Sequence, residues 1–300
     1  MARTYAAIEA GGTKFICAVM DEDARVLDQQ RIPTTDPKET LGQAMAFLAK
    51  VRGDHGALSG LGIASFGPLE LNPASPMFGS IISTPKPGWS GIDILGTLTE
   101  AAGAPAAINT DVNAAALAEI KHGAGQGLSS LCYVTVGTGI GVGYISDGRF
   151  VPDTAHGEIG HMRVPRAEGD TFPGRCPFHT DCLEGLASGP AIRDRWDCSA
   201  EDLPDDHPAW QMEAHYIAAL CNNLIYTLRP QRIVIGGGVF GRASLYGKVR
   251  AALGLMLAGY ALSSEEEALD SFISPPGLDE IPPGLMGAFE LAQQAERGAP

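Results

Sequence analysis

Two histidines and two cysteines, placed close together in the middle of the chain, are the residues best suited to carry chemistry. They are His161, Cys176, His179 and Cys182. Imidazole nitrogens and thiolate sulfurs are preferred ligands of Zn²⁺, and four of them suit a closed tetrahedral structural site. Two carboxylates, Glu158 and Glu184, are interleaved with these ligands in the sequence. Metal binding and chemistry are therefore predicted to share one site.

Two other interpretations of Cys176 and Cys182 are open at this point. They could be buried thiols beside unrelated histidines, because cysteine often behaves as a small hydrophobe, or they could form a disulfide in an oxidising compartment. Residues 1–9 do not resemble a secretory signal peptide, and no later run of about 18 apolar residues could span a bilayer. We therefore expect a cytoplasmic protein with no membrane partner, whose six cysteines are reduced.

Three glycine-rich patches are the elements that could position a phosphate. Residues 6–19 and 131–145 each predict a β-hairpin with glycines at the bend, and residues 232–239 predict a buried strand that runs into three glycines. Glycine lets a ligand approach the backbone, whose N–H groups can bind an anion. None of the patches matches a P-loop or a dinucleotide fingerprint, and a plain turn explains any one of them. The two similar hairpins predict two similar halves.

Helices are predicted where capping residues and apolar periodicity coincide. Residues 113–123 begin with Asn113 as a candidate N-cap and end in a glycine, which places Asp111 just before a helix N-terminus. Apolar residues at alternating steps of four and three between 210 and 228 predict a long core helix. The spacing of apolar residues between 285 and 292 predicts a final helix.

The composition is that of an ordinary globular protein, with 45% hydrophobic residues and enough chain for two medium domains. The 21 basic and 35 acidic residues give a net charge of −14. This charge disfavours a nucleic-acid partner, because affinity for nucleic acid comes mostly from Lys and Arg on phosphates.

Seven motifs follow one another along nearly the whole chain. They are I-E-A-G-G-T-K (8–14), I-A-S-F-G-P-L (63–69), T-P-K-P-G-W (84–89), N-T-D-V-N (109–113), V-G-T-G-I-G-V-G (136–143), the segment with the zinc ligands, and I-G-G-G-V (235–239). In this order they resemble the ROK family of sugar kinases, and within it the bacterial fructokinases. The resemblance implies an α/β protein of the actin-like ATPase (ribonuclease H-like) fold, with two lobes around a cleft, that forms a homodimer.

The resemblance also suggests where the lobes begin and end. The N-terminal lobe would comprise residues 1–117 and be completed by a C-terminal helix, 285–300. The C-terminal lobe would comprise residues 118–284 and contain the zinc-binding segment.

In this family the position of Asp111 implies a general base, which accepts the proton of the sugar hydroxyl that attacks the γ-phosphate of ATP. A carboxylate suffices, because catalysis of phosphoryl transfer rests mostly on positioning and on neutralising charge. The sequence context of Asp111 supports helix capping equally well, and the two roles are compatible.

A nucleotide site for ATP and Mg²⁺ is implied by the glycine patches and one proline. Exposed backbone N–H groups would bind the phosphates, and Mg²⁺ would neutralise the remaining charge. The implied residues are Gly11, Gly12, Thr13, Lys14, Thr138, Gly139, Pro190, Gly236, Gly237, Gly238 and Val239. Pro190 equally suits the first turn of a helix.

The sugar site implied by the resemblance consists of Glu158, His161 and Glu184. His161 would contact the sugar with one ring nitrogen and zinc with the other, since the two nitrogens are distinct. The zinc would be structural, because four protein ligands leave no open position for an activated water.

Three positions depart from the broader family and look like the fructokinase branch. His179 stands in place of a third cysteine, Thr110 precedes Asp111 in place of Asn, and Glu9 stands where many relatives have Asp. The prediction is an ATP-dependent fructokinase that phosphorylates D-fructose at its 6-hydroxyl. At this position the resemblance implies a contact to a water of the bound metal, and the glutamate departs from the aspartate that many relatives use for it.

The resemblance leaves other functions of the family open. A kinase for mannose, glucose or N-acetylmannosamine is the nearest alternative, followed by a non-catalytic sugar sensor, which the presence of Asp111 disfavours. A ROK-type transcriptional repressor is disfavoured because the first hairpin starts by residue 6 and the chain is acidic.

Overall fold

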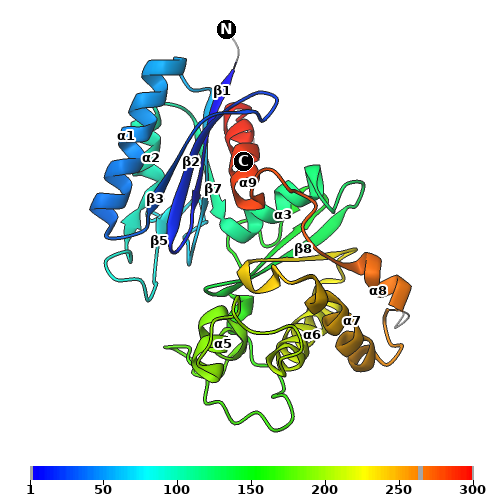
Figure 1. Cartoon of the computed structure of the whole chain (residues 1–300). Helices are drawn as coiled ribbons and strands as arrows, with labels where there is room; N and C mark the ends of the chain where they lie inside the picture. Colours follow the sequence, from blue (N-terminus) through cyan, green and yellow to red (C-terminus); the bar gives the residue numbers. More distant parts are fainter. Residues whose placement is uncertain (1–2, 263–265, 299–300) are drawn as a thin grey trace. The chain divides into compact units, whose positions relative to one another are not determined.

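The computed structural model describes residues 3–262 and 266–298, which form two compact units (Figure 1). Unit 1 comprises the described residues up to Lys121, together with Arg149–Gly157 and those from Leu278 onward, and unit 2 comprises His122–Gly148 and Glu158–Gly277. These bounds differ from the predicted lobes chiefly at Arg149–Gly157, which lies in unit 1. Residues 299 and 300 of the predicted C-terminal helix lie outside the described residues.

Unit 1 is built on a five-stranded sheet with the order β3-β2-β1-β4-β7. The strands β1 (Thr4–Ala10) and β2 (Lys14–Asp21) form the first predicted hairpin, and β3 (Val26–Pro33) pairs antiparallel with β2. The strands β4 (Gly60–Ser65) and β7 (Ala106–Thr110) run parallel to β1. Nearly every residue of β1 and β4 is buried, as expected for a sheet covered on both faces.

Helices cover the two faces of this sheet (Figure 1). The helices α1 (Pro37–His55) and α2 (Ile94–Ala102) pack on each other and on one face. The helix α9 (Pro283–Glu296) packs against β1, β4 and β7 on the other face, and α3 (Asp111–His122) lies beside it. The final helix predicted from the apolar spacing is thus confirmed.

The close packing of α9 on β4 depends on glycines in the strand. A Cβ atom at Gly62 would collide with the backbone carbonyl of Ala288, and one at Gly60 would collide with that of Ala292. We expect Gly62→Ala to lower the free energy of unfolding by about 3 kcal/mol, because the backbone of α9 must move away from the sheet.

Urea denaturation would measure this loss. The matched control is Gly42→Ala in α1, where an added Cβ meets nothing within 4 Å. It should raise the free energy of unfolding by up to about 1 kcal/mol through helix propensity. Equal stability of the two variants would show that α9 does not need the glycine.

Unit 2 has its own sheet with a matching arrangement of strands. The strands β8 (Ser130–Val136) and β9 (Ile140–Ser146) form the second predicted hairpin, while β11 (Ile233–Gly236) and β12 (Ile273–Ser274) continue the sheet in parallel. The order β9-β8-β11-β12 repeats the order β2-β1-β4-β7 of unit 1. This repetition confirms the prediction of two similar halves.

Helices of unit 2 bury a separate hydrophobic core. The long helix α6 (Ala209–Leu228) has the predicted extent and packs against α7 (Ala243–Leu257). The short helices α4 (Leu183–Ala187) and α5 (Gly189–Trp196) follow the cysteine and histidine segment. The remaining elements of unit 2 are η1 (Ile159–His161), η2 (Gly238–Phe240) and α8 (Glu266–Phe272), and those of unit 1 are β5 (Ser80–Ile81), β6 (Ile92–Asp93) and β10 (Arg149–Phe150).

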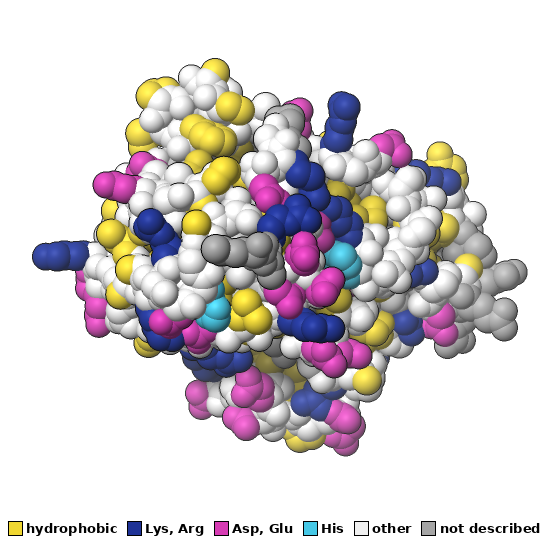
Figure 2. Space-filling model, turned by 90° about the horizontal axis from the view of Figure 1, so that it is seen from above, with side chains coloured by type: hydrophobic (Ala, Val, Ile, Leu, Met, Phe, Trp, Pro, Cys, Tyr) yellow, Lys and Arg dark blue, Asp and Glu magenta, His cyan; other side chains and the backbone are white. Residues whose placement is uncertain are grey.

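Lys and Arg side chains are interspersed with Asp and Glu on the face drawn in Figure 2. No continuous basic surface is visible on this face, in agreement with the net charge of −14. Among the described residues, no helix combines the length and the hydropathy that a membrane span requires.

Candidate active site

The carboxyl ends of three parallel strands bring the first bend and Asp111 to one edge of the sheet in unit 1. Ala10 at the end of β1 pairs with Ser65 in β4, and Ser65 pairs with Thr110 at the end of β7. Gly11 and Asp111, which directly follow β1 and β7, therefore lie two strand spacings apart, about 10 Å. This is the edge at which open α/β sheets bind ligands.

Asp111 is the first residue of α3, so the predicted helix start at Asn113 is wrong. The capping residue is Thr110, whose Oγ1 accepts the Asn113 N–H at 3.2 Å. Asn109 Oδ1 in turn accepts from the Thr110 N–H at 2.9 Å and from Asn113 Nδ2 at 2.8 Å. These three side chains are buried and fix the peptide that carries Asp111, whose Oδ1 accepts the Val112 N–H at 2.9 Å.

The bend between β1 and β2 has its carbonyl oxygens bound from within unit 1. Thr34 donates from Oγ1 to the Gly11 carbonyl at 2.8 Å and from its backbone N–H to the Thr13 carbonyl at 3.0 Å. Lys86 Nζ donates to the Gly12 carbonyl at 2.6 Å. Carbonyl oxygens repel an anion. Because these carbonyls already accept hydrogen bonds from Thr34 and Lys86, the bend is suited to receive a phosphate at its N–H groups.

Glu9 lies two residues before this bend, near the end of β1. Burial raises the pKa of its carboxyl, while Lys14 and Arg31 lower it. Its Oε2 is buried without a hydrogen-bond partner among the described residues, and its Oε1 would lie only 2.7 Å from a Cβ on Gly284. The carboxylate thus has a free oxygen that a cation or its water could use.

In unit 2, the second bend and the third glycine patch also lie at one sheet edge. Thr135 of β8 pairs with Gly236 of β11, so Thr138 and Gly139 lie near the glycines that follow β11. Gly237 has φ +95°, and a Cβ there would collide with the backbone of Val136. The predicted nucleotide residues of this unit are thus brought together.

The helix α5 begins against the second bend. The Gly189 N–H donates to the Gly137 carbonyl at 2.8 Å, and a Cβ on Gly189 would lie 3.6 Å from Val239 Cγ2. Ser188 caps the helix, and its Oγ accepts the Ala191 N–H at 3.4 Å. Pro190 therefore occupies the first turn of a helix, which itself lies beside the predicted nucleotide residues.

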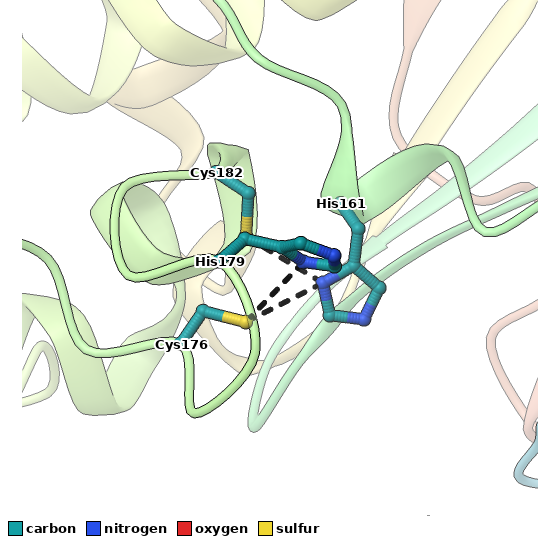
Figure 3. Close-up of side chains that lie close together, drawn as sticks. All are labelled: His161, Cys176, His179 and Cys182. Carbon is teal, nitrogen blue, oxygen red and sulfur yellow. Dashed lines mark hydrogen bonds between the residues drawn. The ribbon is translucent and has the colours of Figure 1, made fainter. Parts of the chain in front are cut away.

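The four predicted metal ligands converge on one point (Figure 3). Their ligand atoms all lie within 4.8 Å of one another. Cys176 Sγ lies 3.6 Å from His161 Nδ1 and 3.7 Å from His179 Nδ1, and Cys182 Sγ lies 3.5 Å from His161 Nδ1. Bonds of about 2.3 Å to sulfur and about 2.0 Å to nitrogen give a tetrahedral edge of about 3.5 Å, so these residues fit Zn²⁺.

Backbone contacts hold this cluster in shape. The amide groups of Cys176 and Thr180 bond to each other at 3.1 and 2.9 Å, which closes the loop that carries His179. The Leu183 N–H donates to the Met162 carbonyl at 2.9 Å and joins the segment after His161 to the start of α4.

Two predicted sugar ligands lie close to this cluster in unit 2. Burial raises the pKa of Glu158. The nearby His161 lowers this pKa and Glu184 raises it, so the three groups interact electrostatically. Nδ1 of His161 faces the cysteines, while its second ring nitrogen points away from them (Figure 3). That nitrogen is therefore the one to which the predicted sugar contact would fall.

Glu184 is fixed by the second bend. Its Oε2 accepts the Ile140 N–H at 3.0 Å, and a Cβ on Gly139 would lie 2.6 Å from the same oxygen. Gly139 therefore has a structural reason to be glycine in addition to its predicted phosphate contact.

Three groups that shape these sites were not assigned a role from the sequence. They are Thr34, Lys86 and His156. His156 Nε2 accepts the Leu69 N–H at 2.9 Å, and burial lowers the pKa of its imidazole, so the neutral ring that this bond requires is favoured. Lys86 belongs to the motif T-P-K-P-G-W, and His156 lies two residues before Glu158 in the segment H-G-E-I-G-H (156–161). Nothing in the local sequence distinguishes Thr34.

Known proteins resemble this chain over its whole length. The model of the ROK family matches residues 5–295. A fructokinase of Pediococcus pentosaceus is 41% identical over 98% of this chain and 99% of its own length, and a fructokinase of Zymomonas mobilis is 41% identical over 98% of both chains. The crystal structure of a ROK hexokinase from Thermus thermophilus matches with a TM-score of 0.77 at 26% identity, covering 99% of this chain and 100% of that one.

Proposed function

Since the chain belongs to the ROK family, we propose that it is an ATP-dependent fructokinase, which transfers the γ-phosphoryl group of ATP to the 6-hydroxyl of D-fructose. The chain is α/β and has the actin-like ATPase fold. The observation that carries the proposal is the 41% identity to fructokinases over nearly the full length of both chains. The arrangement of Asp111 and the glycine bends supports it.

Nucleotide binding is assigned to the glycine bends of the two units. In unit 1, Gly11, Gly12, Thr13 and Lys14 would bind phosphate. Thr34 and Lys86 hold the carbonyls of the first three of these residues, and the Gly11 N–H donates to the carbonyl of Lys14. In unit 2, the assigned residues are Thr138, Gly139, Pro190, Gly236, Gly237, Gly238 and Val239. Mg²⁺, when bound with ATP, neutralises phosphate charge, and the free oxygen of Glu9 could hold one of its waters.

The chemical step needs a proton acceptor that the protein holds in position. Asp111 is the proposed acceptor for the proton of the 6-hydroxyl as that oxygen attacks the γ-phosphorus. The bond from the phosphorus to the bridging oxygen of ATP breaks, and ADP leaves with the electron pair. The buried network of Asn109, Thr110 and Asn113 holds Asp111 in place, which supplies the positioning that phosphoryl transfer requires.

Sugar recognition is assigned to Glu158, Glu184 and the free ring nitrogen of His161. Carboxylates accept hydrogen bonds from sugar hydroxyls, and His161 binds a hydroxyl more favourably when its ring is already held in one orientation. Zn²⁺ bound by His161, Cys176, His179 and Cys182 would hold the ring in one tautomer. The homodimer and the cytoplasmic location stay predictions of the sequence.

A coupled ADP-release assay tests the proposal. Fructose, mannose, glucose and N-acetylmannosamine are supplied in turn with Mg-ATP, and Asp111→Asn is the blank. Fructose should give the highest kcat/KM. Preference for another hexose would transfer the proposal to that sugar, and no turnover above the blank with any sugar would refute it.

Gly139→Ala is expected to weaken fructose binding more than ATP binding. The added Cβ would displace the Glu184 carboxylate, which then loses its bond from the Ile140 N–H. Glu184 is then no longer held in place for the sugar, and we expect KM for fructose to rise by about 10- to 100-fold, the size of a lost hydrogen bond to a charged group.

The matched control for this change is Gly247→Ala in α7, where a Cβ meets nothing within 4 Å. Initial-rate kinetics with each substrate varied in turn would separate the two KM values. A rise in KM for ATP alone would show that Gly139 acts through the phosphates and not through Glu184.

A further inference from the structure

We propose that Lys86 binds nucleotide phosphate together with the Gly11–Lys14 bend, as a cation that the sequence motifs did not assign. The inference rests on the proposed function and extends its phosphate site. Lys86 Nζ lies 2.6 Å from the Gly12 carbonyl, which places its positive charge directly at the bend.

The loop that carries Lys86 is built to hold it there. Pro85 and Pro87 flank the lysine and restrict its backbone. Trp89 is fully buried, packs against Phe15 and Phe66, and donates from Nε1 to the Thr35 carbonyl at 2.8 Å.

Hydrogen bonds within the loop close it further. The Lys86 N–H donates to Thr84 Oγ1 at 3.3 Å, and the Thr84 N–H donates to Ser90 Oγ at 3.2 Å. A lysine on such a loop loses less conformational freedom on binding a ligand than a lysine on an open surface.

The ammonium group of Lys86 still has donors to offer. Among the residues that the structure describes, no carboxylate lies within ion-pairing distance of it, in contrast to Lys50 with Asp28 and Lys121 with Glu290. An ammonium has three donors, and the Gly12 carbonyl takes one of them. The side chain is half-buried, so its charge is less screened than at an open surface.

Charge and geometry therefore agree at this bend. Lys86 and Lys14 supply two positive charges beside backbone amides whose carbonyls are bound elsewhere. An anion with several oxygens, such as the di- or triphosphate of a nucleotide, matches this arrangement better than a neutral sugar does.

The test compares Lys86→Gln, Lys86→Met and Lys86→Arg by calorimetric titration with AMP, ADP, a non-hydrolysable ATP analogue, fructose and fructose 6-phosphate. Glutamine can still donate to the Gly12 carbonyl but carries no charge, whereas arginine keeps the charge. Lys50→Gln is the control, because it removes one positive charge from the same unit away from the bend. Thermal melting checks that each variant is folded. If Lys86→Met does not fold, Lys86→Gln and Lys86→Arg still give the comparison with and without the charge.

We expect Lys86→Gln and Lys86→Met to weaken binding of the ATP analogue by about tenfold or more and binding of AMP by less than about twofold. Lys86→Arg should bind both nucleotides about as tightly as the wild type does. If the affinities for AMP and the analogue fell equally, the proposal would be overturned, and Lys86 would only stabilise the structure of the bend. Unchanged analogue binding, or weaker binding of fructose or fructose 6-phosphate alone, would also overturn it. The titrations need no turnover, so failure of the fructokinase proposal would be seen separately in the ADP-release assay.

Discussion

Replacing Asp111 with asparagine is expected to lower kcat for fructose phosphorylation by about 10²- to 10⁴-fold, with KM for fructose and ATP within about threefold of the wild type. Asparagine cannot accept the proton of the attacking hydroxyl. It can still accept the Val112 N–H through its own Oδ1, so the start of α3 should be preserved. An effect on kcat without an effect on KM is the signature of an interaction made only in the transition state.

The control for this prediction is Asp93→Asn at the start of α2. Asp93 also begins a helix, and its Oδ1 accepts the Gly96 N–H at 2.7 Å. Asparagine is as good an N-cap as aspartate, so this variant should keep full activity. If Asp111→Asn kept more than about a tenth of the wild-type kcat, Asp111 would not be the general base.

Cys182→Ser is expected to remove the metal and to damage sugar binding before ATP binding. The wild type should contain about one zinc per chain, and the variant much less, by elemental analysis. KM for fructose should rise at least tenfold, by about the amount that loss of a metal's support costs, because the ring of His161 is then free to rotate. Calorimetric binding of a non-hydrolysable ATP analogue should change by less than about twofold.

Cys182→Ser should remove a metal ligand without disturbing the helix that follows it. Cys182 is the N-cap residue of α4, and serine is a favourable N-cap, so the helix that carries Glu184 keeps its start. Cys198→Ser is the control, because Cys198 is a thiol outside the cluster. A metal-free variant with normal kinetics for fructose would disprove the role of zinc in the sugar site.

The sequence predicted local structure well where one physical signal dominated. The hairpins at residues 6–19 and 131–145 formed as predicted because apolar runs on both sides of a glycine bend leave few other ways to bury both strands. The start of α3 was placed too late because Asn113 and Thr110 are both acceptable caps by type. Only the burial of Asn109, which binds both, selects Thr110.

The members of the candidate metal site could be named from the sequence alone, because two cysteines and two histidines within 22 residues are a donor set that suits zinc. Its tetrahedral distances and the choice of Nδ1 in His161 depend on the tertiary structure, because the ligands come from segments separated in the chain. The same holds for Lys86 at the Gly12 carbonyl and for Glu184 against Gly139. Residue types and local spacing are written in the chain, but contacts between distant segments exist only once the sheets and their helices have packed.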